Sequence, residues 1–462
     1  MEDAASRRLG EDPIGRLLWR MSAPAAVGLL VQALYNLTDT IFVGRGVGTL
    51  GIAGIAVCFP VQLLVMAIAQ TLGIGGASIV SRALGRGNRE RAERTLGVLL
   101  SLTVGISIVV AVGGSVFLGP LLRVFGATEE IAPFAADYLQ VILIGTVFFM
   151  FAMSTNAIIR AEGQAKIAMG TMLIAGGLNI VLDPVFIFGL RMGIRGAALA
   201  TVIAQATTVV YLVFYFLKGW GGLRVRVRNL VVDWRIAASM FAIGAGSFAR
   251  MVAGSLMMIV LNNVLRGTGG GLAIAAFGVL NRLFTFLLLP MFGIVQGLQP
   301  IVGYNFGSGR IDRVRRTVFL ANVTTTAVST LSFALMMSIP AAILGVFSRD
   351  PELLAMGTPA IRVVVLVFPL IGFQVVAAGM YQALGRVVPA LVLALLRQVI
   401  LLLPLVVILP RFFGLRGVWM AFPAADGGAA LLTAALLLGT FRRFRAVRPH
   451  GDLVAAPDPE TP

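Results

Sequence analysis

The sequence predicts an all-α polytopic membrane protein, with twelve transmembrane helices in two pseudo-symmetric six-helix lobes. Three observations carry this prediction. The 462 residues are 58% hydrophobic and only 12% charged, whereas soluble chains carry about 25% charged residues. The apolar runs are unbroken, which is typical of helical spans and not of the alternating strands of a membrane β-barrel. The chain also repeats itself at a nearly constant offset.

Twelve apolar runs, separated by charged or Gly/Pro-rich breaks, define the predicted spans. Each is long enough to cross a bilayer, which takes about 20 residues in a helix. The predicted spans are 16–41, 50–80, 94–122, 131–156, 166–189, 194–217, 236–265, 272–304, 316–346, 357–381, 388–410 and 416–440.

The basic residues predict the orientation of these spans. When the loops are assigned alternately to two sides, 25 of the 37 Lys and Arg residues fall on the side of the termini and 8 on the other. Cytoplasmic loops of membrane proteins carry such an excess. We therefore expect a multi-pass protein of the cell (inner or plasma) membrane with both termini in the cytoplasm. The net charge of +17 then reflects topology, and no nucleic-acid partner is expected.

The internal repeat predicts the division into lobes. Its aligned residues are Gly85 and Gly87 with Gly307 and Gly309, Gly163 with Gly385, and Arg195–Gly196 with Arg416–Gly417, at offsets of 221 or 222. The predicted units are an N-lobe (1–217), a cytoplasmic linker (218–235), a C-lobe (236–441) and a cytoplasmic tail (442–462). Because six spans is an even number, both lobes enter the membrane from the same side, and their symmetry axis should follow the membrane normal. Two lobes rocking about a central cleft is the architecture of alternating access.

The few polar residues inside the N-lobe spans suggest a site for a coupling cation. Asp39 lies in the first span, Asn179 and Asp183 lie one turn apart on one face of the fifth, and Thr201 lies in the sixth. These are hard oxygen ligands, suited to Na⁺ or to a shared proton and not to a soft metal. Two neighbouring carboxylates do not both ionise cheaply without a cation. The alternatives are structural: an interfacial acid, a polar kink residue, an interhelical hydrogen bond and a hydroxyl bonded within its own helix.

Two prolines mark points where the N-lobe helices could bend. Pro24 lies in the first span, and Pro184 directly follows Asp183. A proline inside a helix leaves a backbone carbonyl without its usual donor and permits a kink. We expect such a weak point to move when the occupancy of the cation site changes.

The C-lobe does not repeat the acidic pattern of the N-lobe. At the repeat offset, Asp39 aligns with Leu261, and no acid lies near position 404, the counterpart of Asp183. The C-lobe instead carries Arg397 in the eleventh span and Asp426 in the twelfth. Because each charge needs a partner in a membrane, these two residues are predicted to form a buried ion pair.

Four segments make the sequence similar to a known family of transporters. They are QALYNLTDTIFVG, SRALGRGN, NIVLDPVFIFGLRMGIRGAALAT and FGLRGVWMAFPAAD, and together they resemble the multidrug and toxic compound extrusion (MATE) family over nearly the whole chain. The resemblance implies a cation-coupled antiporter, driven by H⁺ or Na⁺, that exports amphipathic or cationic drugs and toxic compounds. It also implies that Asp39, Asn179, Asp183 and Thr201 match the N-lobe cation site of the archaeal and DinF-like branch.

Further residues are candidates for the wall of the substrate cleft. We expect a monomer that binds small molecules within the lipid bilayer, with no enzymatic activity and no cofactor besides the transported ion. The cleft candidates are Gln32, Tyr35 and Asn36 in the first span, Arg250 and Met257 in the seventh, and Arg282 in the eighth.

Other functions fit the sequence less well. A flippase for a lipid-linked saccharide or another lipid-like substrate is the main alternative, and the twelve spans together with Asp39 and Asp183 favour efflux over it. An intramembrane hydrolase is disfavoured because the one histidine, His450, lies in the tail. No segment resembles the carbonyl filter of a channel.

Overall fold

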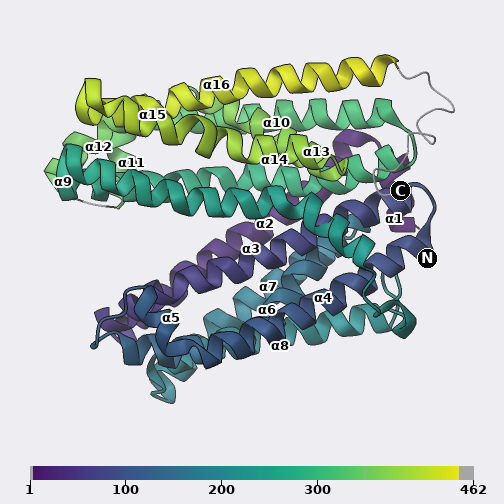
Figure 1. Ribbon diagram of the computed structural model, residues 1–462, viewed down its shortest axis with the longest axis horizontal. Coiled ribbons are helices and arrows are strands. Elements are labelled where there is room, and N and C mark those ends of the chain that lie inside the picture. Colours follow the sequence, from purple (N-terminus) through teal and green to yellow (C-terminus); the bar gives the residue numbers. More distant parts are fainter. Residues whose placement is uncertain (1–3, 348, 447–462) are drawn as a thin grey trace.

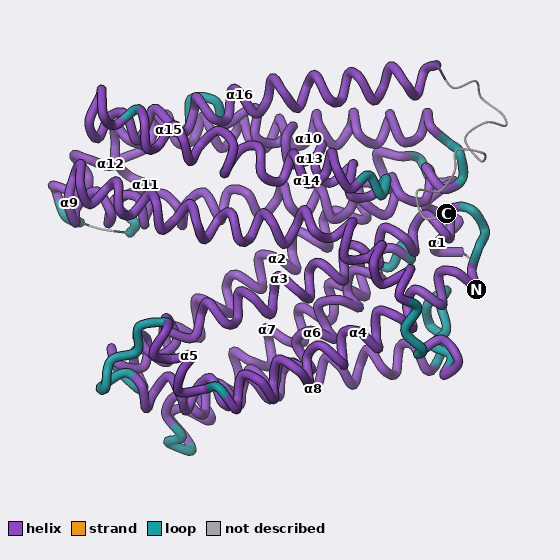
Figure 2. The backbone as a smooth tube through the Cα atoms, in the orientation of Figure 1, coloured by secondary structure: helices purple, strands orange, loops and turns teal. Residues whose placement is uncertain are grey.

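The computed structural model describes residues 4–347 and 349–446. Nearly all of these residues are helical, and no strand occurs among them (Figure 2). The part of the predicted tail from residue 447 onward, His450 included, lies outside the described residues.

The helices follow one another through short loops. Their bounds are α1 Ala4–Glu11, α2 Ile14–Gly46, α3 Thr49–Gly85, α4 Arg89–Val116, α5 Leu118–Val124, α6 Ala132–Ala161, α7 Ala165–Pro184, η1 Val185–Gly189, α8 Gly193–Leu217, η2 Val227–Asn229, α9 Trp234–Gly307, α10 Ile311–Ser338, α11 Pro340–Gly345, α12 Pro351–Val364, η3 Phe368–Leu370, α13 Ile371–Ala383, α14 Val387–Leu395, η4 Leu396–Leu402, α15 Leu403–Ile408 and α16 Pro410–Ala446.

The described helices account for twelve membrane spans. Ten are long and apolar enough to cross a bilayer, and a pair bent by 50°, Pro351–Val364 with Phe368–Ala383, forms another. The 74-residue α9 is two helices joined at Gly270, whose φ of 65° breaks the helical path. Counted as two, it completes the predicted set. The chain is therefore a multi-pass membrane protein with an all-helical fold.

The spans form two bundles, α2–α8 and α9–α16, that diverge toward one end of the molecule (Figure 1). We call the end with α5 and α12 the open end. The opposite end, where α1 lies and α16 finishes, is the closed end.

The bundles meet near the closed end because small residues let their backbones approach. A Cβ atom on Gly75 of α3 would overlap with the carbonyl oxygen of Met240 in α9, and one on Gly244 would overlap with that of Thr71. The Ser78 hydroxyl donates a hydrogen bond to the carbonyl oxygen of Gln382 in α13, at 2.6 Å. The two bundles are thus in direct contact at this end.

The internal repeat corresponds to a repeated backbone geometry. Gly87 and Gly309 end α3 and α9 with φ of 74° and 72°, and Gly163 and Gly385 follow α6 and α13 with φ of 84° and 72°. This left-handed region is one that residues with a side chain rarely adopt. The same turn therefore needs the same glycine in each bundle, as two further pairs also show, Gly48 with Gly270 and Gly193 with Gly414.

The segment between the bundles is attached to α4. Arg226 forms an ion pair with Glu93 at 3.0 Å, and Asp233 forms one with Arg94 at 2.8 Å. Asp233 also caps α9 by accepting a hydrogen bond from the backbone N–H of Arg235. These contacts hold the start of α9 against the first bundle.

Candidate cation site and central cavity

Helices α2, α7 and α8 bring four predicted polar residues together in the first bundle. Asp183 and Asn179 are 0% and 2% exposed. The Asn179 amide donates to Asp183 Oδ1 and to Thr201 Oγ1, at 3.2 Å in each case. The Asp39 and Asp183 carboxyl groups are close enough to share a hydrogen bond. The fold thus brings Asp39 of α2 to the face that α7 and α8 present.

The local backbone explains how these side chains are presented. Thr201 donates its hydroxyl proton to the carbonyl oxygen of Ala197 at 3.1 Å, so its oxygen is free to accept from Asn179. Pro184 closes α7, and the chain continues as a π-helix over Val185–Gly189. Such π-helical turns are rare in proteins, and those that occur are often found at functional sites. Asp183 directly precedes Pro184, the last residue before the π-helix.

Three oxygen atoms of this cluster are buried without any hydrogen-bond donor. They are Asp39 Oδ1, Asn179 Oδ1 and Asp183 Oδ2. A buried acceptor left unsatisfied costs about 1–3 kcal/mol. Three such oxygens in one cluster suit a hard cation, which could coordinate all of them, or a proton shared between the two carboxyl groups.

The second proline, Pro24, lies where α2 packs on the second half of α9. Ser22 donates a hydrogen bond to the carbonyl oxygen of Ile294 at 3.4 Å. Cβ atoms on Gly293 and Gly297 would overlap with Ala26 and Ser22. The same helix therefore carries Asp39 of the cation cluster and a close contact with the other bundle.

A cavity of about 440 Å³ lies between the bundles. From the first bundle, Gln32 and Tyr35 of α2 and Arg160 of the last turn of α6 line it. From the second bundle, Arg250 of α9 lines it.

The predicted spans 131–156 and 166–189 leave Arg160 in the loop between them. No sequence signal placed it in the cavity wall, because its repeat counterpart Gln382, which also lines the cavity, lies outside the predicted span 357–381 as well.

The other three cleft candidates do not line this cavity. Met257 is buried in the apolar core of the second bundle, among Leu261 and Phe277. Asn36 and Arg282 are exposed and lie outside the cavity lining. The rotation of each helix about its axis decides these positions, and the apolar sequence around them is consistent with either face.

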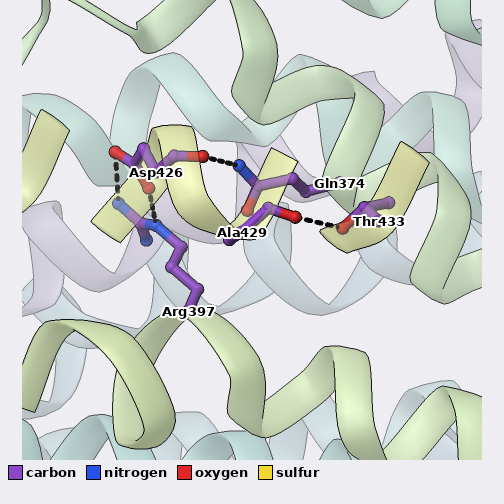
Figure 3. Close-up of polar contacts among 5 residues, drawn as sticks. All are labelled: Gln374, Arg397, Asp426, Ala429 and Thr433. Atoms are coloured by element: carbon purple, nitrogen blue, oxygen red, sulfur yellow. Dashed lines mark hydrogen bonds and ion pairs between the residues drawn. The ribbon is translucent and has the colours of Figure 1, made fainter. Parts of the chain in front are cut away.

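The second bundle holds its acid in an ion pair (Figure 3). Arg397 Nε donates to Asp426 Oδ1, and Arg397 Nη2 lies 3.4 Å from Asp426 Oδ2. The Gln374 amide donates to the backbone carbonyl of Asp426 at 2.8 Å. Arg397 lies in the π-helix Leu396–Leu402. Both carboxylate oxygens of Asp426 are therefore satisfied within the protein.

Comparison with known proteins agrees with this architecture. The MatE family matches the chain twice, over residues 24–185 and 247–408, so each bundle contains one copy. The multidrug export protein MepA of Staphylococcus haemolyticus is 27% identical over 94% of this chain and 95% of its own length. A solved structure of the MATE multidrug transporter DinF-BH is 44% identical, with a TM-score of 0.86, over 93% of this chain and 96% of that one. An outward-facing multidrug resistance MATE transporter of the MOP superfamily is 26% identical, with a TM-score of 0.89, over 96% of this chain and 98% of that one. The chain belongs to the multidrug and toxic compound extrusion (MATE) family of transporters and is not an enzyme.

Proposed function

We propose that this protein is a secondary antiporter that exports amphipathic organic compounds in exchange for Na⁺ or H⁺. The names of its relatives, multidrug export proteins and multidrug transporters, support the substrate class. The two bundles, with a cavity between them, support a mechanism of alternating access.

The observation that carries the coupling is the set of three unpartnered oxygens in the first bundle. A cation or proton bound there would neutralise the Asp39–Asp183 pair and satisfy these acceptors. Helix α2 contacts both α7 and α9, so a change at Asp39 can reach the bundle interface along α2, which contains Pro24. In this mechanism, ion entry and substrate release use different conformations of α2.

Transport into proteoliposomes tests the coupling. We expect rhodamine 6G or carboxyfluorescein, two dyes of opposite charge on one ring system, to move only when a Na⁺ or H⁺ gradient is imposed. Asp39→Asn should abolish this movement, whereas Asp137→Asn, a half-exposed acid paired with Arg195, should retain it. Gradient-independent movement of both dyes would contradict the proposal.

We propose that the closed end faces the cytoplasm, because the Arg-rich loops gather there and cytoplasmic loops are basic. The cavity would then open to the outside. Each bundle and the cavity belong to a single chain, so we propose that the monomer is active in the cell membrane.

Two single-cysteine variants test this orientation. In a Cys58→Ala background, Val227→Cys places a thiol in the linker and Val346→Cys places one after α11, at positions 84% and 82% exposed. A membrane-impermeant maleimide should label the second in intact cells and the first only in inverted vesicles. The reverse pattern would invert the proposed topology.

A further inference from the structure

We propose that the central cavity binds the anionic group of an amphipathic substrate between Arg160 and Arg250. This inference rests on the proposed export function and specifies the charge of the compound carried. It concerns a site distinct from the Asp39–Asp183 cluster, whose acids do not line the cavity.

The charge of the cavity wall is the first observation. Two arginines line it, and among the described lining residues none is acidic and no other is charged. An arginine guanidinium stays protonated in proteins. The wall therefore carries two positive charges, which would repel a cationic compound and attract an anionic one.

The second observation is that neither guanidinium has a partner within the protein. Across residues 4–347 and 349–446, the guanidinium groups of Arg160 and Arg250 make no ion pair and no hydrogen bond to another residue. The nearest acid in sequence to Arg160, Glu162, instead accepts a hydrogen bond from Tyr215 at 2.8 Å. A charged group inside a membrane protein normally has a partner or marks a substrate pathway. Here the partner would come from the ligand.

The two arginines also come from different bundles. Arg160 lies in α6, on the side of the cation cluster, and Arg250 lies in α9. A ligand that fills this cavity therefore contacts both halves of the transporter. Its anionic group would reduce the repulsion between the two guanidinium groups when the bundles close around it.

The remaining lining fits the apolar body of such a ligand. Methionine and phenylalanine side chains, such as Met153, Met251 and Phe292, line the cavity together with neutral amides such as Gln70 and Gln296. Methionine adapts its shape to different apolar partners. The volume of about 440 Å³ lies within the range of small-molecule pockets.

Binding of two matched dyes to the purified protein tests the proposal. Carboxyfluorescein and rhodamine 6G share a xanthene ring, and the first is anionic and the second cationic. Fluorescence anisotropy in a non-ionic detergent gives both dissociation constants. We expect the protein to bind carboxyfluorescein more tightly, and Arg160→Gln or Arg250→Gln to weaken that binding about tenfold or more, as for a lost charged hydrogen bond.

The controls separate the site from general charge effects. Arg160→Gln introduces the residue found at the aligned position 382, so it should preserve the fold. Arg282→Gln removes an arginine that does not line the cavity and should change neither dissociation constant. Tighter binding of rhodamine 6G to the unmodified protein, or unchanged carboxyfluorescein binding in both cavity variants, would overturn the proposal.

Competition with added phospholipids identifies the source of the anion. If phosphatidylglycerol added to the micelles displaces carboxyfluorescein and phosphatidylcholine does not, the anion site accepts a lipid headgroup. If neither lipid displaces the dye, the site accepts a soluble organic anion. Asp39→Asn should still bind carboxyfluorescein, so retained binding without coupled transport, or the reverse, separates this inference from the proposed antiport.

Discussion

The two bundles hold their intramembrane acids in opposite ways. In the first, Asp39 and Asp183 lie side by side, and in the described part of the chain no Lys or Arg forms an ion pair with either. In the second, Asp426 is paired with Arg397. The backbone turns of the repeat are conserved between the bundles, and the charge chemistry is not.

This difference suggests which bundle needs an ion that the protein itself does not supply. A buried charge is costly unless it is paired. The second bundle provides the partner itself, so its carboxylate has no need of a free cation. The first bundle leaves three oxygens without a partner in the protein, and a cation or a shared proton would suit them. We therefore propose that the first bundle couples transport to the ion, whereas the second holds a fixed ion pair.

The largest expected effect comes from breaking the fixed pair. Asp426→Asn leaves the Arg397 charge without its partner, and removal of one member of a buried ion pair typically costs about 3–5 kcal/mol. We expect a clear drop in the thermal unfolding temperature of the purified protein. The double variant Arg397→Met/Asp426→Leu should recover most of the loss. A single variant as stable as the unmodified protein would mean that the pair is not structural.

The second largest expected effect concerns Glu162, a buried acid outside the cation cluster that forms no ion pair within the described part of the chain. Glu162 follows α6, is 1% exposed and accepts a hydrogen bond from Tyr215. Burial raises the pKa of this carboxyl to about 7, opposed by hydrogen bonds from Tyr215 and from the backbone N–H groups of Gly222 and Leu223.

The sign of the pH dependence follows from this raised pKa. Above about pH 4.5 the unfolded chain loses the proton that the folded protein keeps, so stability falls as pH rises to about 7, by an amount on the order of 3 kcal/mol. Glu162→Gln, which cannot ionise, should flatten the unfolding temperature measured between pH 5 and 8. Glu130→Gln, at an exposed acid, should leave the slope unchanged. An equally steep slope in Glu162→Gln would contradict this assignment.

The smallest expected effect tests the role of Thr201 in the cation cluster of the first bundle. Thr201→Val removes the oxygen that accepts from Asn179 and preserves the shape of the side chain. The loss of one neutral hydrogen bond is worth about 1 kcal/mol, so we expect Na⁺ binding, or the proton-driven transport rate, to weaken by about fivefold. Thr207→Val, at an exposed threonine six residues further along α8, is the control. Identical ion dependence in the two variants would exclude Thr201 from the site.

Much of the candidate site was accessible from the sequence because intramembrane acids are scarce. Asp39 and Asp183 could be selected as a pair on that basis, and the structure places them in contact. The spacing of Asn179 and Asp183 by one turn was sufficient to place them together. The cleft candidates were less accessible. Met257 and Arg250 lie on the same apolar helix, and only the packing of α9 turned one into the core and the other to the cavity.

The sequence by itself determined the membrane environment, the twelve spans and the repeat. These follow from local properties, since unbroken apolar runs define spans and a left-handed turn such as that at Gly163 or Gly385 requires glycine. Only the tertiary structure decided which side chains face the central cavity. Helices in this chain are apolar on nearly all faces, so the rotation of each is set by its neighbours. That rotation turned Arg160 into the cavity, turned Met257 into the core and left Asp39 and Asp183 without a base among the described residues.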